Sequence, residues 1–299
     1  MTGKQKISGH RVDSLLKGIF PQCLNRHVDE AISLGWITDH QGRPVKKGDR
    51  ALGPESLNIR ALTNQLEVVS LGNPNLIVPV ESDHESFCVV DKPAGLPCHP
   101  HSLLETETVT HWAFAQFPSC MQVSKEAQPT ITPHRLDTGT TGLLVVAKTA
   151  KAFEDWRQAF HEKLIEKEYL AWCWGVPRHA AFDIEVALVH SRKDPHKMHP
   201  CYRPGTGLPA LSHCELLTAD SLRQISLIRV RSNTGVMHQV RAHLALAGYP
   251  LIGDRYYDQG HEARPLKTEW HLLRASKLKT PWGTFQVSDE SLKNPFGPN

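Results

Sequence analysis

The stretch TPHRLDTGTTGLLVVAK, Thr132 to Lys148, sets a single aspartate, Asp137, ahead of a turn rich in glycine and threonine. The basic residues His134 and Arg135 precede it, and an apolar run from Leu143 to Ala147 follows the turn. A short apolar run behind such a turn predicts a buried strand. An isolated aspartate in a turn usually accepts local backbone and hydroxyl hydrogen bonds, so its role depends on the rest of the chain.

The length of 299 residues suggests two unequal domains, each able to bury apolar surface. The apolar run behind Asp137 is far shorter than the roughly 20 residues that span a bilayer. The N-terminus also lacks the hydrophobic region of a signal peptide. We therefore expect a cytoplasmic, globular protein that acts as a monomer and has no membrane partner.

The seven cysteines form no Cys-x-x-Cys pair, and their number is odd. A disulfide framework or a zinc ribbon is therefore not expected. The segment Cys98-His99-Pro100-His101 is interrupted by proline and lacks a fourth ligand, so it is a poor zinc site. We predict no metal and no cofactor.

Positive charge is concentrated at the N-terminal end of the chain. Residues 1–60 hold ten Lys and Arg against six Asp and Glu, a surplus of four. Because the total formal charge is +3, the remainder of the chain stands at −1. This asymmetry is typical of a protein with a phosphate-backbone partner, although an ordinary solvated surface produces the same count.

The N-terminal segment predicts two helices and a hairpin. Apolar residues recur at helical spacing from Val12 to Ile19 and from Val28 to Ile32, and Trp36-Ile37-Thr38 runs into the turn HQGRP. With its Val-Lys-x-Gly-Asp element, Arg11 to Leu52 resembles the small RNA-binding domain named after ribosomal small-subunit protein S-four. The resemblance implies that cationic side chains of this segment contact RNA phosphates without recognising the base sequence. These side chains are Arg11, Lys17, Arg26, Lys46 and Lys47.

The rest of the chain predicts a linker and a larger domain. We assign 1–60 to the RNA-binding domain, 61–80 to a linker rich in turn residues, and 81–299 to the second domain. From Phe87 onward β-rich runs dominate, with helices expected over about 150–163 and 237–247. The fold class is α+β, with flanking helices on a largely antiparallel mixed sheet and a small N-terminal α/β domain.

Four motifs occur in order after residue 90: DKPAGLPCHP, HRLDTGTTGLLVVAK, KEYLAWCWG and TGVMHQVRAHLALAGYPLIGDRYY. Together they resemble the RluA family of pseudouridine synthases over 91–257. The resemblance implies the catalytic fold of that family and the isomerisation of specific uridines in structured RNA. Motif by motif, it implies a catalytic role for Asp137 of HRLD, Tyr169 of K-x-Y and Arg241 of HQ-x-R.

The same motifs supply the expected substrate-binding residues: Arg135, His134, Thr140, His238 and Leu244. Arg135 is expected either to fill the gap left by an extruded uridine or to form a plain surface ion pair. His134 is expected to support the loop. Val236 stands where the family commonly has arginine, which puts one RNA contact in doubt, and Thr141 replaces a usual serine.

Breaking a uridine N-glycosidic bond requires an ionised carboxylate. Because burial would raise the pKa of Asp137 above about 3.9, a nearby cation is needed, and Arg241 is the candidate. Attack on the sugar C1′ and assistance of elimination to a glycal-like intermediate both remain open. Tyr169 would pack against the base and help remove the C5 proton; alone it could equally be a core tyrosine.

Large-subunit ribosomal RNA is the favoured target, because N-terminal RNA-binding modules in this family more often accompany it; transfer RNA is the alternative. One competing hypothesis is a catalytically silent ribosome-assembly factor on the same scaffold. Another is a hydrolytic glycosidase, which usually needs a second carboxylate that the motifs do not supply.

Overall fold

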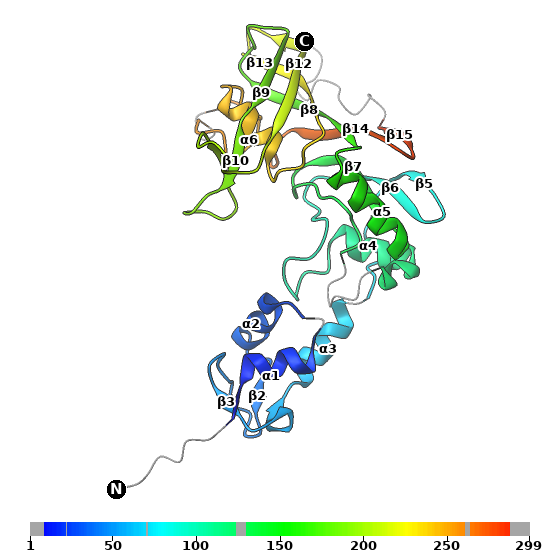
Figure 1. Cartoon of the computed structure of the whole chain (residues 1–299), viewed down its shortest axis with the longest axis vertical. Coiled ribbons are helices and arrows are strands. Elements are labelled where there is room, and N and C mark those ends of the chain that lie inside the picture. Colours follow the sequence, from blue (N-terminus) through cyan, green and yellow to red (C-terminus); the bar gives the residue numbers. More distant parts are fainter. Residues whose placement is uncertain (1–8, 22, 70, 124–129, 261–263, 288–299) are drawn as a thin grey trace. The chain divides into compact units, whose positions relative to one another are not determined.

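The computed structural model describes residues 9–21, 23–69, 71–123, 130–260 and 264–287. Contacts along the chain divide it into two compact units (Figure 1). Unit 1 combines Met1–Ile77 with Pro97–Thr132 and Ala147–Ala150. Unit 2 comprises Val78–Leu96, Pro133–Val146 and Lys151–Asn299. The two units therefore alternate along the sequence.

Unit 1 is built from short helices and two-stranded sheets. Its helices are α1 (Val12–Ile19), α2 (Asn25–Ser33), α3 (Arg60–Val69) and α4 (Val109–Gln116), with 3-10 turns at Pro54–Ser56 and Pro118–Gln122. The antiparallel strand pairs are β1 (His10–Arg11) with β3 (Arg50–Ala51), and β2 (Thr38–Asp39) with β4 (Leu57–Asn58). A bridge between Thr38 and Pro44 closes the predicted hairpin.

The apolar faces predicted for the first two helices meet in one core. Val12, Leu16, Val28 and Ala31 are buried there. The other predicted positions, Leu15, Ile19 and Ile32, pack against the same core in partly buried positions. The helical spacing was therefore a sound guide to this part of the fold.

Leu103 joins this core from a distant part of the chain. Its side chain is fully buried. Its backbone N–H donates to Oε2 of Glu30 at 2.9 Å, and its carbonyl accepts from Nε2 of Gln65 at 2.7 Å. The chain around Leu103, which the sequence assigns to the second domain, thus packs with the N-terminal residues.

The range 61–80, predicted as a linker, contains most of α3. Leu62 is fully buried in the unit 1 core, so the beginning of this range belongs to a folded unit. Its turn-forming residues come later, around Asn73 and Pro74. The use of 1–60 for RNA binding and of 81–299 for catalysis stays a prediction.

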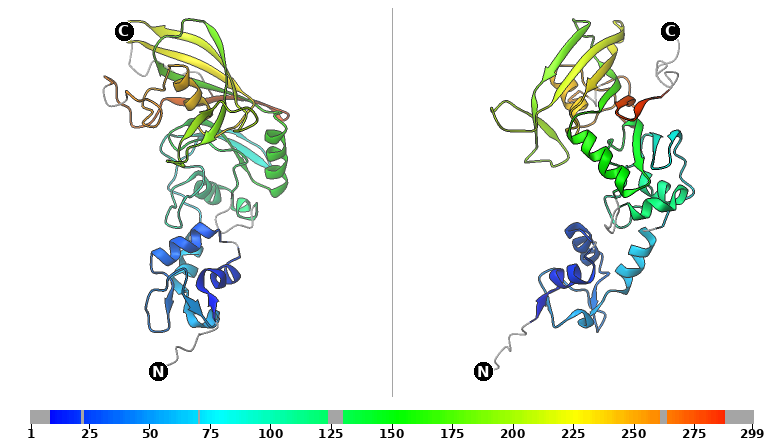
Figure 2. Two further views of the ribbon diagram at one scale, coloured as in Figure 1. Left: turned by 60° about the vertical axis from the view of Figure 1, so that its left-hand side comes forward. Right: turned by 45° about the vertical axis from the view of Figure 1, so that its right-hand side comes forward.

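Unit 2 is organised around a nine-stranded sheet with the order β5-β6-β7-β14-β8-β13-β12-β9, to which β15 adds by pairing with β14. Its strands are β5 (Val80–Asp83), β6 (Phe87–Lys92), β7 (Thr141–Ala147), β8 (Glu166–Trp174), β9 (Ala181–Glu185), β12 (Leu211–Asp220), β13 (Ile225–Ser232), β14 (Leu273–Thr280) and β15 (Gly283–Gln286). The green to yellow strands β8, β9, β12 and β13 lie side by side in both views of Figure 2.

The pairing of β14 with β7 is parallel. The pairs β5–β6, β8–β13, β8–β14, β9–β12, β12–β13 and β14–β15 are antiparallel. A separate antiparallel hairpin joins β10 (Ala187–His190) to β11 (Met198–Cys201). This architecture confirms the predicted α+β class with a largely antiparallel mixed sheet.

The sheet has an apolar core on each face, as the alternation along β8 requires. Ala171 and Cys173 enter one core, whereas Leu170, Trp172 and Trp174 enter the other. Helix α6 (Gln239–Leu246) contributes Val240 and Leu244 to the first core. This packing fixes the helix that carries Arg241 against the sheet.

The predicted helix over 150–163 is α5 (Ala150–His161). It buries Trp156, whereas Phe153 and Phe160 are only half-buried. Among the described residues, the helices are all too short or too polar to cross a bilayer.

Gly142, the second residue of β7, stands where the backbone requires glycine. Its φ is +107°, a conformation that side chains disfavour. A Cβ at this position would lie 2.1 Å from the carbonyl oxygen of Ala275 on β14. Only glycine allows this close parallel approach, which sets the strand behind Asp137 against β14.

Candidate active site

Asp137 lies in the turn that leads into β7. Its carbonyl accepts a hydrogen bond from the N–H of Thr140 at 3.0 Å. The N–H of Gly95 donates to the carbonyl of Thr138 at 2.9 Å. A second turn, from the DKPAG motif, therefore supports the one that carries the aspartate.

Lys92 strengthens this support. Its side chain is fully buried, and its ammonium donates to the carbonyl of Thr138 at 2.9 Å. The same group donates to the carbonyls of Pro93 and Leu96 at 2.9 and 2.8 Å. One buried cation thus ties the two turns together.

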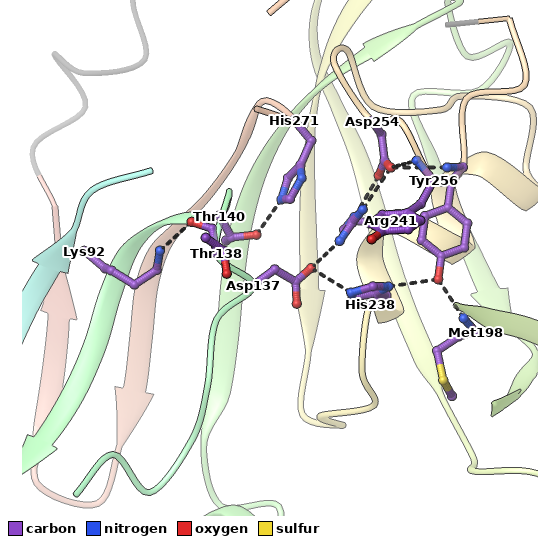
Figure 3. Close-up of polar contacts among 11 residues, drawn as sticks. Lys92, Asp137, Thr138, Thr140, Met198, His238, Arg241, Asp254, Tyr256 and His271 are labelled. Atoms are coloured by element: carbon purple, nitrogen blue, oxygen red, sulfur yellow. Dashed lines mark hydrogen bonds and ion pairs between the residues drawn. The ribbon is translucent and has the colours of Figure 1, made fainter. Parts of the chain in front are cut away.

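The carboxylate of Asp137 faces Arg241 (Figure 3). Nη1 of Arg241 donates to Oδ2 of Asp137 at 2.8 Å, and Nε2 of His238 lies 3.6 Å from the same oxygen. The side chain of Asp137 is 25% exposed, whereas that of Arg241 is 4% exposed. Among the described residues no hydrogen bond reaches Oδ1, so this oxygen is available to a substrate.

Arg241 is fixed from behind by Asp254. Nε of Arg241 donates to Oδ2 of Asp254 at 2.7 Å, and Nη2 of Arg241 donates to Oδ1 of Asp254 at 2.9 Å. Oδ1 also accepts the backbone N–H groups of Tyr256 and Tyr257, and the Asp254 side chain has no exposed surface. The guanidinium therefore has a defined orientation toward Asp137.

The electrostatics keep Asp137 ionised. Burial raises the pKa of Asp137, but the charge of His238 where that ring is protonated, together with the charge and the hydrogen bond of Arg241, outweighs burial and leaves the pKa below its ordinary value. Burial also lowers the pKa of His238, despite the opposing charge of Asp137, so this ring is largely uncharged at neutral pH. Arg241, whose pKa is raised by its carboxylate partners against the effect of burial, is the lasting cation.

Two histidines surround the carboxylate. His238 adopts a left-handed φ of +55° at the start of α6, and its Nδ1 lies 3.1 Å from the hydroxyl of Tyr257. His271 lies 2.8 Å, through Nε2, from the hydroxyl of Thr140. Burial and the charge of Arg241 lower the pKa of His271 to about 4, so this ring is neutral at pH 7.

Tyr169 lies on β8, half-buried against the same core as α6. Burial and the charge of Asp137 raise the pKa of its phenol. The phenol is therefore protonated at neutral pH. Its ring and hydroxyl, rather than a phenolate, are what it can offer a substrate.

The remaining predicted substrate contacts differ in whether their side chains can reach a substrate. Thr140 and His238 lie next to Asp137, and Arg135 is exposed. Leu244, in contrast, is fully buried in the core beneath α6, so it supports the helix and cannot meet the substrate directly. Nε2 of His134 accepts the N–H of Val145 on β7 at 3.0 Å; its loop-supporting role stays a prediction.

Val236 packs against the apolar cluster that includes Met198 of the β10–β11 hairpin. Its backbone N–H donates to the side-chain oxygen of Gln239 at 3.3 Å. The position where an arginine was expected is thus used for packing and for holding the start of α6.

The five N-terminal cations are exposed, but they are not equivalent. Arg11 pairs with Asp13 at 3.0 Å and Lys47 pairs with Asp29 at 2.7 Å. Nε of Arg26 donates to a ring nitrogen of His27 at 3.2 Å. For the other two, no ion pair is found among the described residues: Lys17 and Lys46.

Sequence reasoning missed three residues that shape the site: Lys92, Asp254 and His271. The first two lie within quoted motifs, DKPAG and LIGDRYY, and their charges could have marked them as partners for Asp137 and Arg241. His271 follows the last motif, and its sequence neighbourhood carried no signal.

Within the part of the chain that the structure describes, the arrangement around Arg241 offers Asp137 as its one partly exposed carboxylate. Asp254 is fully buried and bonded through both oxygens, so it cannot serve as the second acid that a glycosidase uses. Across the described residues, no three His, Cys, Asp or Glu side chains are placed to share a metal ion.

Comparison with known proteins agrees with this chemistry. Residues 86–246 match the family described as RNA pseudouridylate synthase. Ribosomal large subunit pseudouridine synthase D of Yersinia pestis is 31% identical over 261 residues, which cover 87% of this chain and 75% of that protein. Dual-specificity RNA pseudouridine synthase RluA of Escherichia coli (strain K12) is 32% identical over 208 residues, 69% of this chain and 86% of that one.

A solved structure supports the fold. Human RNA Pseudouridylate Synthase Domain Containing 1 has a TM-score of 0.57 and 24% identity, covering 74% of this chain and 85% of that one. The family match spans more than half of this chain, and the matched residues include Asp137 and Arg241. The chain belongs to the RluA family of RNA pseudouridine synthases.

Proposed function

We propose that this isomerase converts specific uridines of large-subunit ribosomal RNA to pseudouridine, with Asp137 as its catalytic carboxylate. The observation that carries the proposal is the 2.8 Å contact between Asp137 and the buried Arg241. It joins an ionised, partly accessible carboxylate to a fixed cation. This is the group that cleavage of an N-glycosidic bond requires.

Two routes are compatible with this geometry. Oδ1 of Asp137 attacks C1′ of the ribose as the bond to N1 breaks, or Asp137 removes a ribose proton and an elimination releases the uracil. In the first route the turned ring attacks C1′ through C5 and displaces the carboxylate, so the bond between C1′ and Oδ1 breaks as the carbon–carbon bond forms. In the second, C5 adds to C1′ of the glycal-like intermediate, and the ribose recovers the proton held by Asp137. The proton on C5 must then leave to restore aromaticity. Arg241 favours either route because it keeps Asp137 charged before the bond breaks.

Tyr169 is proposed to pack its ring against the target base. Its raised pKa argues against a phenolate base at neutral pH. A stacked phenol can instead orient the uracil while its hydroxyl donates or relays a proton. Tyr169 lies on β8, close enough to Asp137 for the charge of that carboxylate to raise its pKa, which suits this role.

A stacked uridine cannot reach Asp137, so the nucleotide must leave the RNA helix. Arg135 is exposed and two residues from Asp137, which suits it to fill the vacated position. The exposed N-terminal cations are proposed to anchor surrounding RNA through phosphates. We propose that the protein acts as a monomer in the cytoplasm.

The choice of RNA rests on relatives. The Yersinia relative is named for the ribosomal large subunit, which favours that target. The Escherichia coli relative is named as dual-specific, so transfer RNA is the second candidate. A catalytically silent assembly factor is disfavoured because Asp137, Tyr169 and Arg241 are all present.

The test uses large-subunit ribosomal RNA from a strain that lacks this gene, with pseudouridines mapped by carbodiimide-based sequencing. The wild-type protein should add pseudouridine at defined sites. Asp137→Asn should add none, yet bind the RNA within several-fold of wild type, because phosphate contacts dominate affinity. Residual turnover above a few per cent would remove Asp137 from the catalytic role.

Asp91→Asn is the matched control. Asp91 is 20% exposed and bonded to Nη2 of Arg274 at 2.6 Å, so it resembles Asp137 in exposure and pairing. This variant should retain most of the activity. If wild-type protein modified transfer RNA but left ribosomal RNA unchanged, the target assignment would fail while the role of Asp137 stood.

A further inference from the structure

Trp270 is a large aromatic residue with no assigned role. It is 36% exposed, in a unit where Trp172 and Trp174 are buried. It lies three residues before β14. Thr268 fixes its backbone, because the Thr268 hydroxyl donates to the carbonyl of Trp270 at 2.7 Å.

The indole rests on the two turns that support Asp137. A Cβ added to Gly139 would lie 2.9 Å from Cε3 of Trp270, and one added to Gly95 would lie 3.4 Å from Nε1. These turns are themselves joined by the hydrogen bond from Gly95 to Thr138. Glycine at both positions leaves room for the ring, which therefore has a firm support.

The same ring lies on the turn that carries Asp137. Gly139 is two residues from Asp137, and the neighbour of Trp270, His271, bonds Thr140 at 2.8 Å. The charges of Asp137 and His271 also influence each other's pKa. Trp270 thus presents partly exposed aromatic surface on the turn that carries the carboxylate.

We propose that Trp270 is a stacking platform for the nucleobase that neighbours the extruded uridine. The inference rests on the proposed function, because only extrusion leaves an adjacent base without its stacking partner. An exposed indole on a rigid support replaces that partner without selecting a base, since every base has a π-face. A nucleobase is the occupant favoured here because the ring lies on the turn that carries the carboxylate proposed to act on RNA.

The first test replaces Trp270 with Ala, Leu or Phe and measures the affinity of a stem-loop carrying a uridine mapped as above. The Asp137→Asn background prevents turnover during binding. Loss of one stacked base weakens binding by about 5- to 150-fold. The Ala and Leu variants should both show this loss, whereas Phe should retain most of the affinity. Leu fills volume without an aromatic face, so wild-type affinity for Trp270→Leu would overturn the proposal.

Trp282 supplies a matched control. It is 40% exposed and follows β14, so the eight residues of that strand separate it from Trp270 by roughly 25 Å. Trp282→Leu should bind the stem-loop like its parent. An equal loss from both tryptophans would indicate a general effect on folding and would also overturn the proposal.

The second test identifies the stacked base with stem-loops that lack the base on the 5′ or the 3′ side of the target uridine. If Trp270 stacks on one of these, removing that base and the indole together should weaken binding no more than either change alone. Additive losses for both RNAs would contradict the inference. Failure of the proposed function has a different signature, because the wild-type protein would then leave the intact stem-loop unmodified.

Discussion

Arg241 and Asp254 form a buried ion pair with two hydrogen bonds, at 2.7 and 2.9 Å. The pair leaves Nη1 as the donor that points to Asp137. Because a guanidinium is planar, fixing two of its nitrogens fixes the direction of the third. Asp254 is therefore a positioning residue for Arg241, which in turn holds the charge of Asp137.

Replacing Asp254 with Asn should lower both stability and the rate of the chemical step. The amide leaves Arg241 with one anionic partner and sets N–H donors against the guanidinium. Breaking one side of a buried ion pair typically lowers the free energy of unfolding by about 3 kcal/mol, which urea denaturation measures. Single-turnover rates should fall more than RNA affinity, because Asp254 has no exposed surface.

The stability difference between the wild-type protein and Asp254→Asn should depend on pH. Burial raises the pKa of Asp254, but its hydrogen bond with Arg241 and the charge of that arginine lower it below its ordinary value. Such a group stabilises the fold above its unfolded-state pKa of about 3.9, and this contribution is lost as the pH falls through the folded-state pKa. The difference should be constant above about pH 5 and shrink below 4. A constant difference down to pH 3 would contradict the pairing.

His271 should contribute to acid sensitivity. Burial and the charge of Arg241 lower its folded-state pKa to about 4, from an ordinary value of 6.5. A histidine with a lowered pKa stabilises the fold above the unfolded-state value, and this stabilisation is lost as the pH falls from about 6.5 toward 4. His271→Gln should remove up to about 1.4 kcal/mol per pH unit from the slope of unfolding free energy over this range. Equal slopes for both proteins, measured by urea denaturation at pH 7, 6 and 5, would refute this.

The contact between Asp137 and Arg241 was predictable from the sequence. The resemblance to the RluA family marked both residues, and a buried carboxylate needs a cation to stay charged. The strand and helix faces were equally readable from apolar spacing, as Leu16 and Ala31 illustrate. These inferences depend on local pattern or on a chemical requirement.

What sequence reasoning missed depends on contacts between distant residues. Thr140 and His271 are 131 positions apart, and Leu103 meets Glu30 across 73 positions. Leu244 shows a different limit, because membership of a motif does not say which side of a helix faces the core. The helix over Arg60–Val69 runs into a turn-rich stretch, so composition favoured a linker.

The N-terminal cations should differ in their effect on RNA binding. Lys17 and Lys46 are exposed and, within the described part of the chain, have no acidic partner, whereas Arg11 and Lys47 must leave Asp13 and Asp29 to reach a phosphate. Each phosphate contact adds about 0.9 to the slope of log affinity against log salt for a duplex. The double variant Lys17→Gln/Lys46→Gln should therefore flatten this slope by up to about 2. The double variant Arg11→Gln/Lys47→Gln should flatten it less, and equal slopes for all three proteins would exclude this surface from binding.

Removing residues 1–60 should leave unit 2 folded, since its sheet and the apolar cores on the two faces of that sheet are built from residues after position 78. The truncated protein should retain part of its activity on a short stem-loop and should preferentially lose its activity on long structured RNA. Its log affinity for RNA should also fall less steeply with log salt concentration. An unchanged slope and affinity for long RNA would make the N-terminal segment a structural part or a protein-docking surface.

The same truncation should create a defect that the composition does not reveal. Leu103 would lose most of the core that buries it, and its N–H would lose Glu30, while Gln65 remains in the chain. Exposed apolar surface and a released loop favour aggregation and proteolysis near residue 103. Leu103→Ser should therefore raise the solubility of the truncated protein, yet lower the stability of the full chain by about 2 to 5 kcal/mol, as for other large-to-small core changes. If the substitution left the full chain equally stable in urea, Leu103 would not be part of the N-terminal core, and the deletion could be placed at residue 60 without penalty.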